Sequence, residues 1–250
     1  MITIAKQSAE IISFLRQNLH ENLNALAHLE HRPDANIMLY NNNLENGLII
    51  ENAKVQRCLY YVATRSPEFM NEFWAALPPV DCVFSGVPKD IAYMFLQGKR
   101  FSWKSFCKTY VLTGEFQPLQ SSEYKKESLF IEDADEVDKH YAYRSKSSLA
   151  DFRKCIETRE TACIRIDNQL ASWVLVHLDD GSIGPLYTKK KFRRKGLAEL
   201  VLSRQIENLL ANGRIPYAQI HDYNMAPLTL IKKFPGMEYS HDCAWFGIDK

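Results

Sequence analysis

The chain has 250 residues, of which 46% are hydrophobic and 24% charged, with ten glycines and ten prolines. This composition is typical of a globular protein and excludes disordered, collagen-like and disulfide-scaffold chains. The 31 basic and 30 acidic residues leave a formal charge of +1, so no global field would draw a nucleic acid or an anionic membrane to the whole surface. At roughly 100–200 residues per domain, the length fits one large domain or two smaller ones.

Cysteine spacing and hydropathy indicate a cytoplasmic protein. No two of the six cysteines lie closer than eight residues, so the zinc or redox pattern Cys-x-x-Cys is absent and buried free thiols are expected. The segment Met1–Lys6 lacks the features of a signal peptide. No apolar run approaches the ~20 residues needed to cross a bilayer, so no membrane partner is expected.

Taken in chain order, the first half alternates helical and strand patterns. Apolar spacing predicts a helix from Ser8 to about His31. Ser66 and Pro67 predict the start of a second helix that ends at Leu77. A third helix is expected over Pro88–Leu96. Strands are predicted over Ile37–Tyr40, Leu48–Glu51, Cys58–Ala63 and Cys82–Phe84. The alternation indicates an α/β fold.

A stretch rich in Gly, Pro, Gln and Ser between Thr113 and Lys126 predicts a linker, and hence two domains, 1–122 and 123–250. In the second domain, helices are predicted over Asp133–Tyr141, Ser148–Thr158, Gly196–Leu210 and Met225–Phe234. Strands are predicted over Leu129–Ile131, Ala162–Ile166, Leu170–His177, Ile183–Thr188, Tyr217–His221 and Cys243–Ile248. Ser148 and Asp151 suggest a helix-capping pair. No internal repeat is visible in the sequence.

The segment Lys189–Lys195 carries six basic residues in seven positions, with no acidic residue between Asp180 and Glu199. It directly precedes Gly196, where an amphipathic helix is expected to begin. A helix N-terminus has free N–H groups and a partial positive charge, and a small residue there lets an anion approach the backbone. The sequence therefore predicts a phosphate or pyrophosphate site. A merely solvated loop and an RNA-binding patch are the alternatives.

The residues Arg193-Arg194-Lys195-Gly196-Leu197-Ala198 fit the pattern [Gln/Arg]-x-x-Gly-x-[Gly/Ala], whereas the Walker and Gly-x-Gly-x-x-Gly patterns are absent. The fitted pattern is the acyl-CoA pyrophosphate motif of the GNAT acyltransferase superfamily. The order of elements around it also resembles that superfamily: a strand before it, then an amphipathic helix, the strand Tyr217–His221 and a short helix beginning after Asn224.

Four short segments resemble one branch of this superfamily in particular, the glycine N-acyltransferase-like proteins. These segments are Ser172–Leu175, Arg194–Leu197, Ile215–Tyr217 and Asp242–Trp245. The resemblance covers about residues 128–250. It implies an α/β (α+β) chain with a GNAT fold, whose central mixed, mostly antiparallel sheet is flanked by helices. It is compatible with a smaller preceding α/β domain that is a degenerate copy of the same fold.

The resemblance implies transfer of an acyl group, most simply acetyl, from acetyl-CoA or another acyl-CoA to the amine of a small molecule or amino acid. The amine would attack directly in a ternary complex, so proximity supplies much of the acceleration. The implied cofactor-binding residues are Leu186, Tyr187, Thr188, Arg193, Arg194, Lys195, Gly196, Leu197, Ala198 and Asn224. No metal is expected, because the His-Asp pairs at 221–222 and 241–242 complete no ligand set.

The proton-transfer groups depart from the family pattern. Relatives that conjugate glycine carry a Glu base after the turn Gly, where this chain has Ser182. Many members carry a Tyr acid seven residues after the helix Asn, where this chain has Ile231. The catalytic candidates are therefore His221, Ser182 and Asp180, and imidazole ordinarily titrates near neutral pH. Structural roles compete for each of them: hydrogen bonding for the histidine and turn formation for the aspartate.

Three functions stay open: an active N-acyltransferase, a module that binds acyl-CoA with weak or lost catalysis, and a nucleic-acid or partner-binding protein that uses residues 189–195. The third is disfavoured because the wider basic surface and interleaved aromatics of such binders are lacking. The expected partner is thus a small amine acceptor and no nucleic acid, in a monomer or homodimer.

Overall fold

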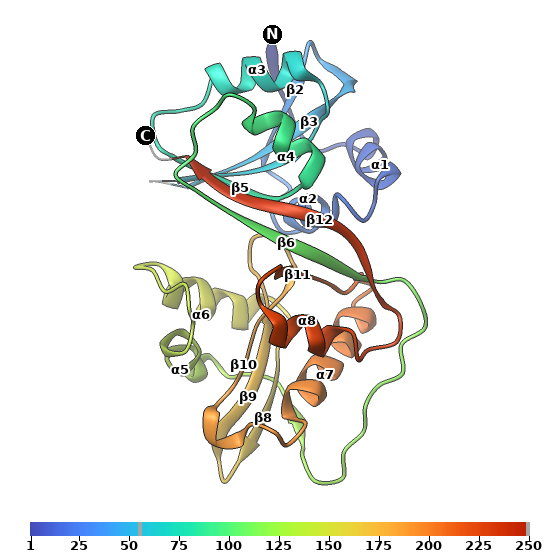
Figure 1. The fold of residues 1–250 in the computed structure, drawn as a ribbon, viewed down its shortest axis with the longest axis vertical. Coiled ribbons are helices and arrows are strands. Elements are labelled where there is room, and N and C mark those ends of the chain that lie inside the picture. The colour runs from blue at the N-terminus through green and yellow to red at the C-terminus, as the bar shows by residue number, and fades with distance from the viewer. Residues whose placement is uncertain (55–56, 249–250) are drawn as a thin grey trace. The chain divides into compact units, whose positions relative to one another are not determined.

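The computed structural model describes residues 1–54 and 57–248, and their contacts divide into two compact units (Figure 1). The first unit comprises Met1–Tyr110, Gln219–Met225 and the described residues from Tyr239 on; the second comprises Val111–Ala218 and Ala226–Glu238. This division differs from 1–122 and 123–250. The reason is that the last strand, β12 (Met237–Ile248), pairs with β5 (Asp81–Pro88) of the first unit.

The elements of the first run of the chain follow the predicted alternation closely. They are β1 (Ile2–Ala5), α1 (Ala9–Gln17), α2 (Leu23–His31), β2 (Asn36–Tyr40), β3 (Asn43–Lys54), β4 (Arg57–Ala63), α3 (Pro67–Ala75), β5, α4 (Lys89–Leu96) and β6 (Trp103–Leu112).

The single helix predicted over residues 8–31 is wrong. It is two helices, because the buried Asn22 donates its side-chain amide to the carbonyl of Leu15, 3.0 Å away, in the turn between them. Strands β1 and β6 were not predicted.

The core of the first unit lies on both faces of its sheet. In β4, Tyr60 and Val62 pack with α3 and α4, whereas Leu59 and Tyr61 pack with α1 and α2. Successive strand side chains point to opposite faces, so the apolar run Cys58–Val62 supplies both layers at once. The result is a sheet with a helix pair on each face.

The strand order of the large sheet is β1-β2-β3-β4-β5-β12-β6-β11. Its pair β4–β5 is parallel, whereas β1–β2, β2–β3, β3–β4 and β5–β12 are antiparallel. The expected mixed, mostly antiparallel sheet is therefore confirmed.

The second run of elements forms a four-stranded sheet and its helices. They are β7 (Lys126–Glu127), a 3₁₀ turn at Ile131–Asp133, α5 (Ala134–Lys139), α6 (Ser148–Thr158), β8 (Ala162–Ile166), β9 (Gln169–Val176), β10 (Ile183–Thr188), a 3₁₀ turn at Lys190–Phe192, α7 (Leu197–Ala211), β11 (Tyr217–His221), α8 (Met225–Ile231) and β12. The sheet order is β10-β9-β8-β7, all antiparallel. Helices α5 and α6 pack on one face and α7 on the other.

Two local predictions in the second unit are wrong. Residues 129–131 are not a strand: the backbone N–H of Leu129 bonds to the Thr161 hydroxyl at 2.9 Å, and a 3₁₀ turn follows. Ser148 does not cap α6, because its hydroxyl donates to the buried carboxylate of Asp138 instead. Both differences come from tertiary partners that local sequence does not reveal.

The order of elements repeats along the chain. From β1 to β6, and again from β7 to β12, the chain forms a strand, two helices, three strands, a helix, a strand, a helix and a strand, if the short 3₁₀ turns are set aside. Sequence alone showed no such repeat, since the matching positions carry different residues.

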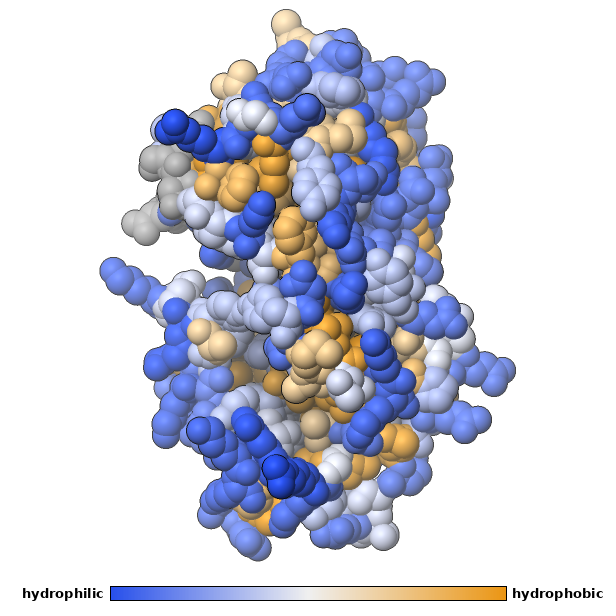
Figure 2. Space-filling model, viewed as in Figure 1, coloured by the Kyte–Doolittle hydropathy of each residue, from blue (hydrophilic) through white to orange (hydrophobic). Residues whose placement is uncertain are grey.

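The six cysteines are all buried and none forms a disulfide, which confirms the prediction of free thiols. Among residues 1–54 and 57–248, no helix has the length and hydropathy to span a bilayer. The face drawn in Figure 2 is mostly hydrophilic, with apolar side chains in smaller groups between.

Candidate functional site

The predicted anion loop connects β10 to α7. After Thr188 the chain makes a 3₁₀ turn, and it enters the helix at Leu197. Phe192 is buried and packs with Leu197 and Val201 in the core under α7. This one apolar side chain holds the loop down, while the basic residues on either side of it are exposed.

The backbone of the loop opens toward solvent at the start of α7. Arg194 and Gly196 have φ angles of 64° and 73°, and Gly196 is an N-cap with no side-chain hydrogen bond. The helical ladder begins where Glu199 and Leu200 donate to the carbonyl of Gly196. A Cβ added at Gly196 would meet nothing within 4 Å. The backbone at Gly196, just before the ladder, thus borders open space, as an anion site requires.

Only half of the loop's cations are engaged within the protein. The Lys189 ammonium lies 2.5 Å from a carboxylate oxygen of Glu136 and holds the pKa of that carboxyl below its ordinary value. Lys191 bonds to the Gln169 side-chain oxygen, and the Arg193 Nε donates to the Thr188 carbonyl at 3.0 Å.

The remaining cations, Lys190, Arg194 and Lys195, have no ion-pair partner within the described part of the chain. Of the six cations in the loop only Lys189 contacts a carboxylate in the described part of the chain, so five positive charges before the helix start are uncompensated, which favours a compact polyanion there.

Strand β10 is an edge strand, so the backbone groups on its outer side pair with no other strand of its sheet. Thr188 pairs with Ser172 and Leu186 with Val174, while Lys189 donates to the Ala171 carbonyl at 3.0 Å. In an antiparallel ladder, alternate residues turn their N–H and C=O groups toward the partner strand. The backbone groups of Leu186 and Thr188 therefore face away from β9, and those of Tyr187 face it.

The turn before β10 holds two of the catalytic candidates. Asp180 is 1% exposed, and one carboxylate oxygen accepts from both the N–H and the hydroxyl of Ser182, at 2.9 and 2.8 Å. The Tyr217 hydroxyl donates to the Asp180 carbonyl. Ser182 is 3% exposed, so its hydroxyl is committed inside the turn. This geometry favours turn formation over substrate contact for both residues.

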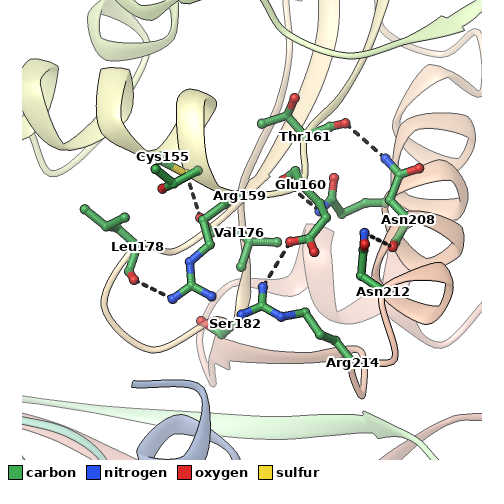
Figure 3. Close-up of polar contacts among 12 residues, drawn as sticks. Cys155, Arg159, Glu160, Thr161, Val176, Leu178, Ser182, Asn208, Asn212 and Arg214 are labelled. Carbon is green, nitrogen blue, oxygen red and sulfur yellow. Dashed lines mark hydrogen bonds and ion pairs between the residues drawn. The ribbon is translucent and has the colours of Figure 1, made fainter. Parts of the chain in front are cut away.

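A polar cluster anchors this turn and the far end of α7 (Figure 3). Arg214 pairs with Glu160 at 3.0 Å, and Arg159 donates to the Leu178 carbonyl at 2.8 Å. Asn208 of α7 donates to the Thr161 carbonyl at 3.1 Å, where β8 is about to begin. These bonds fix the helix against the ends of β8 and β9, and so help to set where its N-terminus points.

His221 and Asn224 belong to the first unit, whereas the loop and the turn belong to the second. The Nδ1 of His221 lies 2.6 Å from the Ser105 hydroxyl and 3.5 Å from the Cys107 sulfur, both on β6. Burial lowers the pKa of His221 below its ordinary value, against the opposing effect of Asp222.

Asn224 is exposed directly before α8, and its N–H donates to the His221 carbonyl at 2.9 Å. Ile231 is buried in that helix. No group of His, Cys, Asp and Glu residues able to hold a metal occurs among the residues described.

Known proteins share both sequence and fold features with the chain. A family model described as FR47-like protein matches residues 163–246, from β8 to β12. No curated protein matches the chain in sequence.

Among solved structures, a Drosophila protein is 15% identical to this chain and has a TM-score of 0.77, and the match covers 98% of this chain and 98% of the Drosophila chain. An acetyltransferase of the GNAT family from Colwellia psychrerythraea is 15% identical, with full coverage of both chains and a TM-score of 0.58. The fold is a GNAT fold. A GCN5-related N-acetyltransferase from Sphaerobacter thermophilus, 12% identical, covers 100% of this chain and 98% of its own, with a TM-score of 0.56. GNAT neighbours thus extend over both units, whereas the glycine N-acyltransferase-like branch stays a prediction.

Proposed function

We propose that the chain is an acyl-CoA-dependent N-acyltransferase, most simply an N-acetyltransferase, that acts on the amine of a small molecule or amino acid. The observation that carries the proposal is the open N-terminus of α7 at Gly196, which directly follows a loop of mostly uncompensated cations and lies one short turn after the edge strand β10. Figure 2 also shows strongly hydrophilic side chains near the lower end of its view, where Figure 1 places the connection from β10 to α7.

The residues present fit a pyrophosphate. The N–H groups at positions 195–198 precede the helical ladder, and the guanidinium of Arg194 is free to pair with phosphate oxygens. Because a side chain at position 196 would project into the open space, glycine keeps the backbone accessible.

The edge of β10 fits the arm that follows the pyrophosphate. The pantetheine arm of coenzyme A contains two amide groups, and an exposed strand edge pairs with amides as it would with another strand. Leu186 offers an outward N–H and C=O, and Thr188, two residues on, offers an outward N–H, while its carbonyl accepts from Arg193; the arm would lie along β10. In this arrangement Tyr187 adds an aromatic ring to the proposed site. The Arg193 guanidinium lies over that ring, with its Cζ 5.7 Å from the ring centroid. Asn224 is proposed as a further contact to the arm.

Bound acyl-CoA supplies a thioester carbon that a free amine can attack. The chain holds and orients the two substrates, and it must provide a proton acceptor. His221 is the candidate from sequence: its lowered pKa keeps the imidazole neutral at pH 7. For Nε2 to accept a proton, Nδ1 must carry one and donate it to the Ser105 hydroxyl.

The alternative is an acyl-CoA-binding module without efficient catalysis. It is favoured by the closed turn, where Asp180 and Ser182 bond to one another, and by the buried Ile231 at the expected acid position. A small amine acceptor, and a monomeric or homodimeric state, remain part of the proposal.

Acetyl-CoA should stabilise the wild-type protein in a thermal melt. At a concentration a hundredfold above Kd, the gain in unfolding free energy would be about 2.7 kcal/mol. The double variant Arg193→Glu/Gly196→Glu should lose this shift, because it places two negative charges at the anion site.

The matched control is Lys232→Glu/Gly213→Glu, which makes the same changes in charge. Lys232 is exposed, and Gly213 has open space beyond the other end of α7. The control should keep the shift. If the first variant keeps it as well, the assigned site is wrong. Release of free thiol from acetyl-CoA with a panel of amines then separates an enzyme from a binding module.

A further inference from the structure

One histidine of the second unit lies against the irregular part of β10. His177 directly follows β9, and its backbone closes the turn: its N–H donates to the Ser182 carbonyl at 2.8 Å and its carbonyl accepts from Gly181 at 3.0 Å. A Cβ added at Gly184 would lie 2.9 Å from His177 Nε2 and 3.3 Å from its Cδ2. The imidazole therefore packs on the bare backbone of Gly184, where a larger residue would displace it.

The contact falls where β10 leaves its ladder. Pairing with β9 shifts register between Ile183 and Leu186, so Gly184 and Pro185 form a bulge. Bulges re-aim side chains and end pairing, and they are common beside active sites. The His177 ring is half-buried and has no hydrogen-bond partner within the described part of the chain.

The bulge lies at the far end of the proposed cofactor edge. From Thr188, beside the anion loop, back to Gly184 is about 13 Å at a rise of roughly 3.3 Å per residue. An arm anchored by its phosphates at the loop and paired with the Thr188 N–H and the outward groups of Leu186 brings its sulfur end to the bulge. The imidazole is thus placed at the reacting end of the arm and not at its phosphate end.

We propose that His177 is the general base that takes the proton from the attacking amine, a role that sequence reasoning gave to His221. The inference rests on the proposed N-acyltransferase function. Three polar side chains at or beside this turn are less suited, because Asp180 and Ser182 are buried and bonded to one another and Arg159 donates to a backbone carbonyl. Imidazole is also the side chain that exchanges protons near neutral pH.

Atoms, electrons and protons are all accounted for in the proposed acyl transfer. The lone pair of a neutral amine forms the C–N bond to the thioester carbon, and the C–S bond breaks with its electron pair leaving on sulfur. One N–H proton of the amine passes to His177 Nε2, and the thiolate takes up one proton. An amine and a thioester thus become an amide and a thiol, and the imidazole returns to its neutral form by releasing its proton to the thiolate or to water.

The test compares His177→Gln with His221→Gln and with His20→Gln, a change at an exposed histidine. Glutamine keeps polarity and approximate size but cannot serve as the base. We expect kcat for thiol release to fall at least a hundredfold in His177→Gln. The acetyl-CoA thermal shift should stay at the wild-type value, because the phosphate site is intact. Added imidazole should restore part of the rate of His177→Ala.

The outcomes separate the inference from the function on which it rests. A His177→Gln enzyme within threefold of the wild-type kcat overturns the inference and leaves the acyltransferase proposal standing, the more so if His221→Gln is slow. If His177→Gln is slow and has also lost the acetyl-CoA shift, or if imidazole restores none of the rate of His177→Ala, the histidine has a structural role, which overturns the inference too. If the wild-type protein shows no acetyl-CoA shift or no thiol release with any amine, the function fails and the inference with it.

Discussion

Burial is the largest influence on the pKa of His241, a residue outside the proposed site. It is half-buried on β12, with its Nδ1 3.0 Å from the Ser240 hydroxyl. Burial lowers the pKa of His241 below its ordinary value, although nearby carboxylates, among them Glu21 and Asp242, oppose the shift. The folded protein therefore resists protonation of this ring more than the unfolded chain does.

This difference predicts a loss of stability in acid. Below pH ~6.5 the unfolded chain binds a proton at His241 that the folded state does not. The contribution of the neutral ring to the free energy of unfolding is therefore complete above that pH and is lost as the pH falls. His241→Gln should consequently lose less thermal stability than the wild type between pH 8 and pH 5.5. The difference in melting temperature between the two proteins at pH 8 gives the cost of the substitution itself. Melts of both proteins across this range then measure the pH-dependent part. Parallel pH profiles would contradict the prediction.

Helix caps show which elements local sequence can define. Ser66 accepts a hydrogen bond from the Phe69 N–H at 3.2 Å and precedes a proline at the first helical position, as the sequence predicted. At α6 the N-cap is Ser147, which makes no such bond, and the neighbouring Ser148 is drawn to Asp138. The first cap depends only on residues 66–69, whereas the hydroxyl of Ser148 is held by a carboxylate ten residues away.

The two serines form a matched pair for a stability measurement. Ser66→Ala removes a cap bond and should reduce the free energy of unfolding by about 1 kcal/mol. Ser147→Ala also changes an N-cap serine, but it removes no bond to a free helical N–H, so its cost should be a few tenths of a kcal/mol. Urea denaturation of the two variants measures both values. Equal costs would show that the bond at Ser66 contributes nothing.

Sequence predicted those elements whose pattern is local. The apolar run Cys58–Val62 and the basic loop before Gly196 were identified because composition and spacing are enough for them. Strand β6 was missed, since its polar residues Lys104 and Lys108 interrupt any apolar run and its place comes from long-range pairing. The sequence pattern predicts only that His177 ends a strand. Its contact with Gly184 exists only through the bulge in the next strand, which has no local signature.

At the scale of the whole molecule, the repeated order of elements supports the proposal that the N-terminal run is a degenerate copy of the fold that carries the anion loop. The counterpart of the connection from β10 to α7 is the connection from β4 to α3. There Ser66 fills the cap, and Pro67 has no N–H to offer. Arg65 is engaged by Glu21 at 2.9 Å and by Asp90 at 3.0 Å. In the first connection, therefore, a helical N–H is already bonded to a side chain and the charge of the arginine is compensated.

This contrast predicts one acyl-CoA per chain despite two copies of the fold. An anion at the start of α3 would have to displace the Ser66 cap and break two ion pairs, whereas at the start of α7 it meets open space and uncompensated charge. Calorimetric titration of acetyl-CoA should give a stoichiometry near one for the wild type. The variant Arg193→Glu/Gly196→Glu should show no binding, since no second site replaces the first. A stoichiometry near two, or binding that persists at half the wild-type stoichiometry in the variant, would mean that the N-terminal copy has kept a site of its own.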